Sequence, residues 1–461
     1  MLFNSIEYLL FLPVVLLFVV IFKKNLTTPI LLIASYYFYY YGSKNLLILI
    51  LISTLIDFFI SHKIYKTKSK VKRKQLLFIS IFTNLFLLFT YKYLDFSIDI
   101  INRLFSTTLP LQKLPLPVGI SFYTFQTMAY TIDVYNKKIK PEKSLKHFAL
   151  FVCYFPQLVA GPIESAKNLL PQLKKPFKFN FNNFTKGLTI ILYGVFIKTV
   201  IADRLALFVN DVYNNPYAAS SANLLLCAYL FAFQIYFDFS GYTNIAIGTA
   251  KIFGVNLSKN FNTPYFSHSV QNFWQRWHIT LSNWFKNYVY FPLGGSRKGL
   301  IRTLVNIFIV FLVSGLWHGA SYNFVIWGLL HGFYIFIETI FSKQLAKIPK
   351  LLRIFITFNL VVFSWIFFRV PRLNEAFYVI KKILSNPLSL KDITFNFTYW
   401  QQNLNLAIFF TLIVVFLEYL YSKNYSFYKL PLLFKYIISI VTIFIIIIFS
   451  VNRSDFLYFA F

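Results

Sequence analysis

Long apolar runs, each close to the length of a membrane-spanning helix, follow one another along most of the 461-residue chain. A bilayer core about 30 Å thick is crossed by a helix of about 20 apolar residues. By this criterion, segments are expected near residues 8–22, 26–42, 45–60, 76–91, 116–134, 147–160, 187–203, 222–240, 300–317, 322–340, 351–368, 404–421 and 433–451. The pattern therefore predicts an all-α, polytopic membrane protein with about 11–13 membrane helices, some of them re-entrant or tilted.

Two stretches interrupt this succession of apolar runs. Residues 251–297 are amphipathic and rich in Trp, Asn and His, and residues 369–402 are polar. Neither is long enough for a separate soluble catalytic domain, because domains have at least roughly 50 residues. We therefore expect a single integral-membrane domain over residues 1–461. Its sections are N-terminal helices (1–100), a core (101–340), and C-terminal helices with an aromatic tail (341–461).

The composition excludes most classes of soluble protein. Hydrophobic residues make up 57% of the chain and charged residues only 13%, whereas soluble domains have roughly a quarter charged residues. Soluble enzymes, nucleic-acid-binding proteins and secreted domains are excluded on this ground. The two cysteines, Cys153 and Cys227, lie in apolar runs and have no metal-ligand spacing.

The net charge of +30 is best explained by basic loops held against anionic lipid. The loop from His62 to Gln75 holds seven Lys and Arg residues and no acidic residue, so it is expected on the cytoplasmic side. Counting back through the apolar runs makes the turn at Lys23 and Lys24 cytoplasmic as well. This topology places Met1 on the outer side.

Histidine and tryptophan are concentrated in two neighbouring segments, Gln271–Gly299 and Val313–Gly332. These segments hold three of the six histidines and five of the seven tryptophans. Ionisable groups at membrane depth are costly, so each is a functional hypothesis. His318, at the end of an apolar run, can act as a neutral base that takes the proton of an acceptor hydroxyl. The alternative, a buried histidine bonded to a neighbouring helix, stays open.

Other residues in and near these segments are candidates for supporting roles. Trp317 can shield His318 from lipid, and His278 follows Arg276 in an amphipathic segment. His331 lies beyond a polar break, and packing against another helix explains it better than catalysis. The carboxylate of Asp238 can orient a histidine or pair with Arg276, or it can make a contact at a helix end.

Several common catalytic and metal-binding motifs are missing from the sequence. No HExxH motif indicates a metal site, and no GxSxG motif indicates a serine nucleophile. A Walker or GxGxxG loop is absent too. We therefore expect no bound metal and no nucleotide hydrolysis.

Five sequence blocks together resemble a known family. They are PVGISFYTFQTMAYTIDVY (117–135), YFPQLVAGPI (154–163), YFDFSGYTNIAIG (236–248), FNTPYFSHSVQNFWQRWHITLSNWFKNYVYFPLGG (261–295) and GLWHGASYNFVIWGLLHG (315–332). The chain resembles the membrane-bound O-acyltransferase family, in the bacterial branch of the membrane proteins for alginate and peptidoglycan O-acetylation and teichoic-acid esterification. The resemblance implies a helical bundle with a central tunnel.

The resemblance also implies roles for particular residues. The resemblance implies catalytic roles for His318, which matches the family's signature histidine, and for His278, which matches its second polar position. At Asn244 many relatives have Asp, which leaves Asp238 as the remaining acid of that block. Near the end of the chain, Tyr458 resembles an aromatic tyrosine motif proposed to accept the acyl group and pass it on. An aromatic belt at the membrane surface also explains this tail.

The function implied is transfer of an acetyl group, with acetyl-CoA as donor, across the bacterial cytoplasmic (inner) membrane. A separate periplasmic or extracellular acetyltransferase partner protein would place the acetyl group on a cell-surface polysaccharide such as alginate-like exopolysaccharide or peptidoglycan. Three alternatives stay open: D-alanyl transfer to teichoic acid, a transporter or flippase without covalent chemistry, and a scaffold for the partner. The sequence shows no internal repeat, which argues against many transporter folds.

Overall fold

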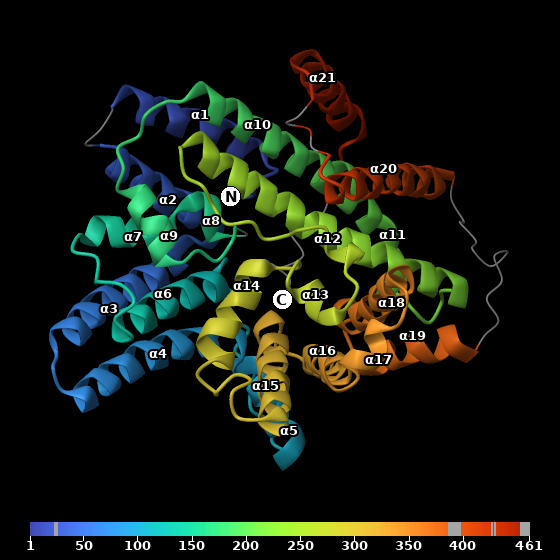
Figure 1. Cartoon of the computed structure of the whole chain (residues 1–461), viewed down its shortest axis with the longest axis horizontal. Helices are drawn as coiled ribbons and strands as arrows, with labels where there is room; N and C mark the ends of the chain where they lie inside the picture. Colours follow the sequence, from blue (N-terminus) through green and yellow to red (C-terminus); the bar gives the residue numbers. More distant parts are fainter. Residues whose placement is uncertain (23–25, 160, 386–397, 426, 428–429, 452–461) are drawn as a thin grey trace. The chain divides into compact units, whose positions relative to one another are not determined.

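The computed structural model describes residues 1–22, 26–159, 161–385, 398–425, 427 and 430–451. All regular elements within these ranges are helices, and no strand occurs there (Figure 1). The all-α prediction is therefore confirmed. The chain forms two compact units, of which the N-terminal unit comprises Met1–Ile191 with Thr243–Lys259 and the C-terminal unit comprises Leu192–Tyr242 with Asn260–Phe461. The expected sections of a single domain and the central tunnel stay predictions.

The N-terminal unit is a bundle of helices with buried polar contacts. Its elements are α1 (Ile6–Ile21), α2 (Thr27–Ser43), η1 (Lys44–Leu46), α3 (Leu47–Lys66), α4 (Lys70–Lys92), α5 (Leu94–Phe105), α6 (Ile120–Tyr135), α7 (Leu145–Cys153), α8 (Phe155–Leu158), α9 (Ala166–Leu173) and most of α10 (Phe181–Val195). Between α3, α4 and α6, the buried carboxylate of Asp57 accepts hydrogen bonds from Ser80, from Asn84 at 2.8 Å and from Thr131 at 3.2 Å. Buried polar groups in membrane helices need such internal partners, so these bonds hold the three helices together.

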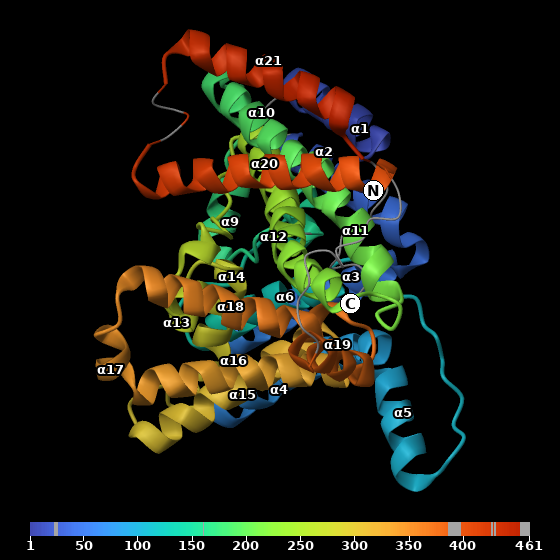
Figure 2. The ribbon, with the colours of Figure 1, turned by 90° about the vertical axis from the view of Figure 1, so that its right-hand side faces the viewer.

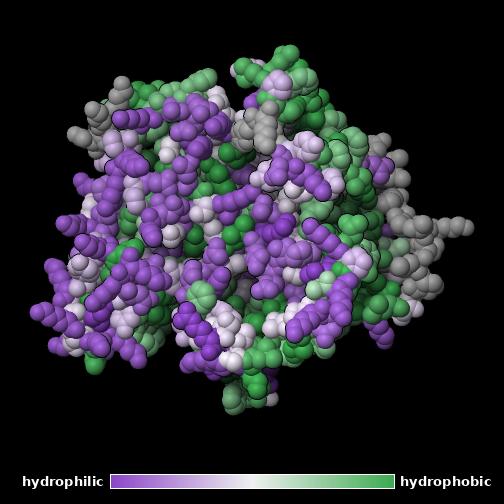
Figure 3. Space-filling view, in the orientation of Figure 1, coloured by the Kyte–Doolittle hydropathy of each residue, from purple (hydrophilic) through white to green (hydrophobic). Residues whose placement is uncertain are grey.

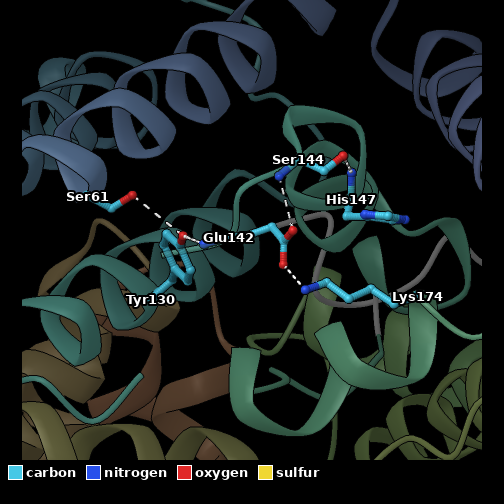
Figure 4. A network of polar contacts seen from close by, with 6 residues as sticks. All are labelled: Ser61, Tyr130, Glu142, Ser144, His147 and Lys174. Carbon is cyan, nitrogen blue, oxygen red and sulfur yellow. Dashed lines mark hydrogen bonds and ion pairs between the residues drawn. The ribbon is translucent and has the colours of Figure 1, made fainter. Parts of the chain in front are cut away.

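A second buried carboxylate, Glu142, fixes the loop between α6 and α7 (Figure 4). It forms an ion pair with Lys174 just after α9 and accepts a bond from the Ser144 backbone N–H at 3.1 Å. The Glu142 backbone N–H donates to the Tyr130 hydroxyl at 2.8 Å, and Ser61 of α3 donates to the same hydroxyl at 3.5 Å. The loop is thus bonded to α6 and to the residue that follows α9, and Tyr130 links it to α3.

The C-terminal unit contains the His- and Trp-rich segments. Its elements are η2 (Phe196–Ala202), α11 (Asp203–Asn214), most of α12 (Ser221–Ile252), η3 (Pro264–Phe266), α13 (Val270–Trp274), α14 (Ile279–Phe285), η4 (Lys286–Tyr290), α15 (Leu300–His318), α16 (Tyr322–Ile340), α17 (Ser342–Ala346), α18 (Lys350–Arg369), α19 (Leu373–Ser385), α20 (Thr398–Ser422) and α21 (Leu432–Phe449). Helices α15, α16 and α18 lie side by side (Figure 2). The amphipathic stretch expected over residues 251–297 forms short helices and turns.

Eight helical segments in the described residues are long and apolar enough to cross a membrane. The first, Thr27–Lys66, contains both α2 and α3, which are separated at Lys44, where φ is +45°. The last, α21, buries none of its residues, and its surface is hydrophobic (Figure 3). Because these side chains face outward, lipid is their natural solvent. The protein is therefore a multi-pass membrane protein.

Several predicted membrane segments are shorter helices in the structure. The run near 116–134 forms α6, which has 16 residues and buries 14 of them. The run near 147–160 is divided between α7 and the four-residue α8, which contains Pro156. Apolar runs that are buried in protein look the same in sequence as runs that face lipid. This similarity explains why the expected 11–13 segments exceed the eight long helices.

Candidate active site

The turn between α15 and α16 brings His318 and Trp327 together. Helix α15 ends at His318, and α16 begins after a three-residue turn. A Cβ atom on Gly315 or on Gly328 would collide with backbone atoms of the facing helix. Small residues let two membrane helices approach closely. The two glycines therefore allow the backbones to touch and place the aromatic ring of one helix against the imidazole of the other.

His318 is enclosed by aromatic rings. It is 2% exposed, and its ring centroid lies 4.9 Å from the ring centroids of Trp317 and Trp327. The ring of Phe368, in α18, lies 5.4 Å away. Rings from three helical positions thus hold the imidazole at the end of α15. The contact places Trp317 where the sequence analysis expected it, beside His318, and its role in shielding the imidazole from lipid stays a prediction.

The hydrogen bonds of His278 determine which of its ring nitrogens carries the proton. The side-chain oxygen of Asn260 accepts a hydrogen bond from the Thr280 backbone N–H at 3.3 Å, so the oxygen is the atom that faces this group. His278 Nδ1 lies 3.2 Å from the same oxygen and must therefore be the donor. Burial lowers the pKa of His278 to about 3. The ring is then neutral, with the lone pair on Nε2.

Trp317 contacts both histidines that were predicted to be catalytic. Its ring centroid lies 6.0 Å from that of His278 and 4.9 Å from that of His318. The structure therefore places these two residues, from segments 40 positions apart in the chain, on one tryptophan. The side chain of Phe239, in α12, packs against His278 at 4.7 Å.

His331 joins the same group through Trp327. Its ring centroid lies 4.9 Å from that of Trp327, which also contacts His318. The Trp274 indole N–H donates to His331 Nδ1 at 3.3 Å. Together the nine residues form what we call the aromatic–histidine cluster: His278, His318, His331, Trp274, Trp277, Trp317, Trp327, Trp365 and Phe368.

Asp238 has a different place from the one expected from the sequence. Its carboxylate lies 2.5 Å from the ammonium nitrogen of Lys198, which lies 2.5 Å from the carboxylate of Asp203. These three residues, the ionic cluster, are buried in η2, α11 and α12. A Cβ atom on Gly241 would lie 2.9 Å from that of Lys198, so a glycine is needed for this close approach. The structure thus places Asp238 in an ion pair with Lys198, a partner that was not among the alternatives given for it from the sequence.

Arg276 and Tyr458 complete the list of predicted site residues. The Arg276 guanidinium donates to the Thr263 hydroxyl at 3.5 Å, and its backbone carbonyl accepts from Asn262 at 2.9 Å. Through these two hydrogen bonds, Arg276 stabilises the loop before α13. Tyr458 lies outside the described residues, so its role stays a prediction. Within the described ranges, no group of His, Cys, Asp and Glu is arranged to hold a metal ion.

The sequence analysis missed Lys198 and Asp203 of the ionic cluster, Trp365 and Phe368 of the aromatic–histidine cluster, and Asn260, which contacts His278. A signal existed for Lys198, because a lysine inside the apolar run 187–203 is costly unless it is paired. Trp365 lies in an apolar run where a tryptophan has no distinguishing pattern. Asn260, which orients His278, lies in a loop, and its role depends on the folding of that loop onto α14.

The aromatic–histidine cluster has the groups needed for proton transfer between a hydroxyl and a leaving group. A neutral imidazole can accept a proton at one nitrogen, and its surroundings decide which substrate reaches it. Comparison with known proteins identifies that chemistry. The family model for membrane-bound O-acyltransferases matches residues 30–379. The chain belongs to this family.

Similar proteins agree with the membership. The chain is 37% identical over 369 residues to the peptidoglycan O-acetyltransferase of Helicobacter pylori, which covers 73% of this chain and 70% of that protein. It is 35% identical over 340 residues to the probable alginate O-acetylase AlgI of Pseudomonas aeruginosa, covering 72% and 65% of the two chains. It is 28% identical over 270 residues to the teichoic acid D-alanyltransferase of Bacillus subtilis, covering 54% and 68%.

Membership of the membrane-bound O-acyltransferase family makes the protein an O-acyltransferase, as the resemblance implied. It favours this chemistry over a transporter or a scaffold without a covalent step. The matched residues contain all five sequence blocks and extend well beyond the predicted core of 101–340. They also contain His278, His318 and His331, together with both carboxylates of the ionic cluster.

Proposed function

We propose that this O-acyltransferase moves an acetyl group from acetyl-CoA to an acceptor hydroxyl, for O-acetylation of a bacterial cell-surface polysaccharide. The observation that carries the proposal is the buried His318 imidazole, which shares Trp317 with His278. Neutral imidazoles in a water-poor site suit a reaction that must deprotonate an alcohol without hydrolysing the thioester.

In the proposed step, the hydroxyl oxygen attacks the carbonyl carbon of the thioester while His318 takes the hydroxyl proton. The carbon–sulfur bond then breaks, and the thiolate of CoA leaves with the proton that His318 had taken. An ester forms, free CoA thiol is released, and His318 returns to its neutral state. His278, as the second neutral imidazole on Trp317, would assist by accepting a hydrogen bond at Nε2.

The surface of the N-terminal unit supports a cytoplasmic, negatively charged donor. Exposed lysines come from residues 63–74, 137–146 and 167–178. Contacts of Arg73 with the Tyr135 carbonyl and of Glu142 with Lys174 bring these stretches together. Figure 3 shows hydrophilic residues gathered over α3, α4, α7 and α9. Such a surface would face the cytoplasm of a bacterial inner membrane and attract the phosphates of CoA.

The names of the relatives support a polysaccharide acceptor for the proposed reaction. Alginate-like exopolysaccharide and peptidoglycan are the acceptors that these names suggest. A periplasmic or extracellular acetyltransferase would complete the transfer. The hydroxyl of Tyr458 would serve as the relay that accepts the acetyl group from the CoA thioester and yields it to that partner.

D-alanyl transfer to teichoic acid is a second candidate. It is favoured by the similarity to the teichoic acid D-alanyltransferase of Bacillus subtilis. The same imidazole would serve as base, because both reactions convert a thioester to an ester. The higher identity to O-acetylating relatives supports acetyl transfer as the main proposal. Incubating the purified protein with radiolabelled acetyl-CoA distinguishes the two candidates, since only acetyl transfer consumes this donor.

The proposal is tested in a strain that lacks the gene and is complemented with variants. Wild-type protein should restore ester-bound acetate in the wall or exopolysaccharide, and His318→Ala should not. His147→Ala, a histidine change in α7 of the N-terminal unit, is the matched control and should restore the ester. Tyr458→Phe tests the relay alone. Normal acetate content with His318→Ala, at equal amounts of protein in the membrane, would rule out the proposed base.

A further inference from the structure

Three tryptophans of the aromatic–histidine cluster have indole N–H groups for which the described residues offer no acceptor. The side chains of Trp277, Trp327 and Trp365 are 0%, 0% and 1% exposed. In the part of the chain that the structure describes, none of their Nε1 atoms has a hydrogen-bond partner. The ring of Trp365 contacts the other two, with centroids 5.1 Å from Trp277 and 5.8 Å from Trp327. The three donors therefore belong to one contiguous group, here called the indole donors.

Buried donors are nearly always paired, because a donor that loses water without gaining a protein acceptor weakens folding. Trp274, in the same cluster, follows this rule by donating to His331 Nδ1 at 3.3 Å. The three indole donors depart from this rule, and their tryptophan rings form one contiguous group, so their lack of acceptors is informative. They indicate that the acceptors come from outside the described residues, and water or a bound molecule can supply them.

His331 adds a fourth donor to this group. Because its Nδ1 accepts the bond from Trp274, its neutral ring carries the proton on Nε2. His331 is 0% exposed, and Nε2 has no partner within the described residues. Its ring lies 4.9 Å from that of Trp327, centroid to centroid. The Nε2–H group of His331 is thus a fourth buried donor beside the indole donors.

We infer that the indole donors bind the acyl carbonyl oxygen of the thioester donor, so that they select a thioester over a ligand without that carbonyl. An indole N–H can only donate, so the matching ligand group is an acceptor. The ring contacts of Trp277 and Trp365 are with other aromatic side chains, among them Tyr236, Tyr265 and Phe368. Such neighbours suit an uncharged carbonyl better than a phosphate, which needs cationic partners.

The position of the indole donors fits the step proposed above, on which this inference rests. Trp327 contacts His318, so a carbonyl held by the donors lies beside the base that activates the hydroxyl. When the hydroxyl attacks, negative charge develops on the carbonyl oxygen. Donors already aimed at that oxygen stabilise the charge more than they stabilise the ground state. The same groups would therefore contribute to both donor selection and rate.

The test compares two CoA thioethers that cannot transfer an acyl group. S-acetonyl-CoA keeps a carbonyl, whereas S-propyl-CoA lacks it. Titration calorimetry of the purified full-length protein should show about tenfold tighter binding of S-acetonyl-CoA, the effect expected of well-formed hydrogen bonds. Trp365→Phe and Trp277→Phe, which keep an aromatic ring and remove the N–H, should reduce this preference to twofold or less. Trp284→Phe removes an indole outside the group and should keep it.

Three results would overturn the inference. Equal binding of both analogues by the wild type would do so, and so would an unchanged preference in both phenylalanine variants. In either case the labelled-acetate transfer assay would still report whether the proposed function holds. If the wild type binds neither analogue, acetyl-CoA is the wrong donor, and both proposals fall. Thermal unfolding of each variant shows whether it is folded.

A measurement on the wild type alone gives a second test that needs no variant. The infrared carbonyl stretch of bound S-acetonyl-CoA, labelled with carbon-13 at the carbonyl, should lie below its frequency in an apolar solvent. A frequency equal to that in the apolar solvent would show that no donor reaches the oxygen, and the inference would be wrong.

Discussion

Two buried polar regions of the C-terminal unit differ in whether their polar groups have partners within the described part of the protein. In the ionic cluster, the ammonium group of Lys198 lies 2.5 Å from a carboxylate oxygen of each of two aspartates. In the aromatic–histidine cluster, the polar groups are imidazoles and indoles, and several N–H donors have no acceptor in the described part of the chain. The first region pairs its charges internally, and the second leaves hydrogen-bonding capacity open.

This difference separates a structural role from a catalytic one. A buried charge without a partner costs several kcal/mol, so the ionic cluster is held together by its own electrostatics and joins η2, α11 and α12. An open donor costs less and can be offset when a ligand binds. Intramembrane ionisable residues are therefore not all equal evidence of function. Whether a group is paired within the protein indicates which of the two roles, structural or catalytic, applies to it.

The largest expected effect in this comparison is that of Lys198→Met. It leaves two buried carboxylates without their cation, and removing one partner of a buried ion pair costs about 3–5 kcal/mol. We expect little folded protein in the membrane. Quantitative immunoblotting of membrane fractions and thermal unfolding in detergent measure this loss.

A compensating variant sharpens the result. Combining Lys198→Met with Asp203→Asn and Asp238→Asn removes all three charges, and replacement of a whole ion cluster by neutral groups is often tolerated. The combined variant should therefore recover most of the lost protein. Normal abundance of Lys198→Met alone would show that the ionic cluster does not hold these helices together.

Asp238→Asn alone should weaken the fold without changing the chemistry. It keeps the size of the side chain but removes one of two carboxylates around Lys198, so we expect a loss of about 1–3 kcal/mol in stability. The turnover rate per folded molecule should stay within about twofold, because Asp238 is part of the ionic cluster. A large fall in turnover with unchanged melting temperature would return Asp238 to a catalytic role.

The smallest expected effect is that of Trp274→Phe. It removes one hydrogen bond, to His331 Nδ1, with a net contribution of about 1 kcal/mol. His331 would then be free to carry its proton on either nitrogen. We expect turnover to fall by about fivefold or less, in line with that hydrogen bond, and the melting temperature to change little. A loss as large as that for His318→Ala would mean that His331, not His318, carries the reaction.

Much of the fold follows from the apolar runs. The run near 433–451 is α21, which is exposed along its whole length and reads correctly as a lipid-facing helix. The run near 116–134 has the same apolar character, yet α6 is surrounded by protein. Local sequence does not encode what a side chain will face. That information comes from packing between helices far apart in the chain.

The candidate site could be predicted from the sequence only where it contains residues that are energetically unfavourable inside a membrane. A histidine after an apolar run identified His318, and the concentration of tryptophans identified its surroundings. The sequence did not show whether His318 and His331 lie close together, because helical spacing does not hold across the break before α16. Only the packing of α15 against α16 shows that both histidines contact Trp327. The sequence left several contacts open for Asp238 and did not indicate its ion pair with Lys198, because Lys198 belongs to a different helical element.

The central claim is that His318 removes the proton of the acceptor hydroxyl. Its most direct test is a single-turnover assay with purified protein, radiolabelled acetyl-CoA and a soluble hydroxyl acceptor. We expect His318→Ala to form the labelled ester about 10²–10⁴-fold more slowly than wild type, with unchanged affinity for the donor. Ester formation by His318→Ala at the wild-type rate would contradict the account.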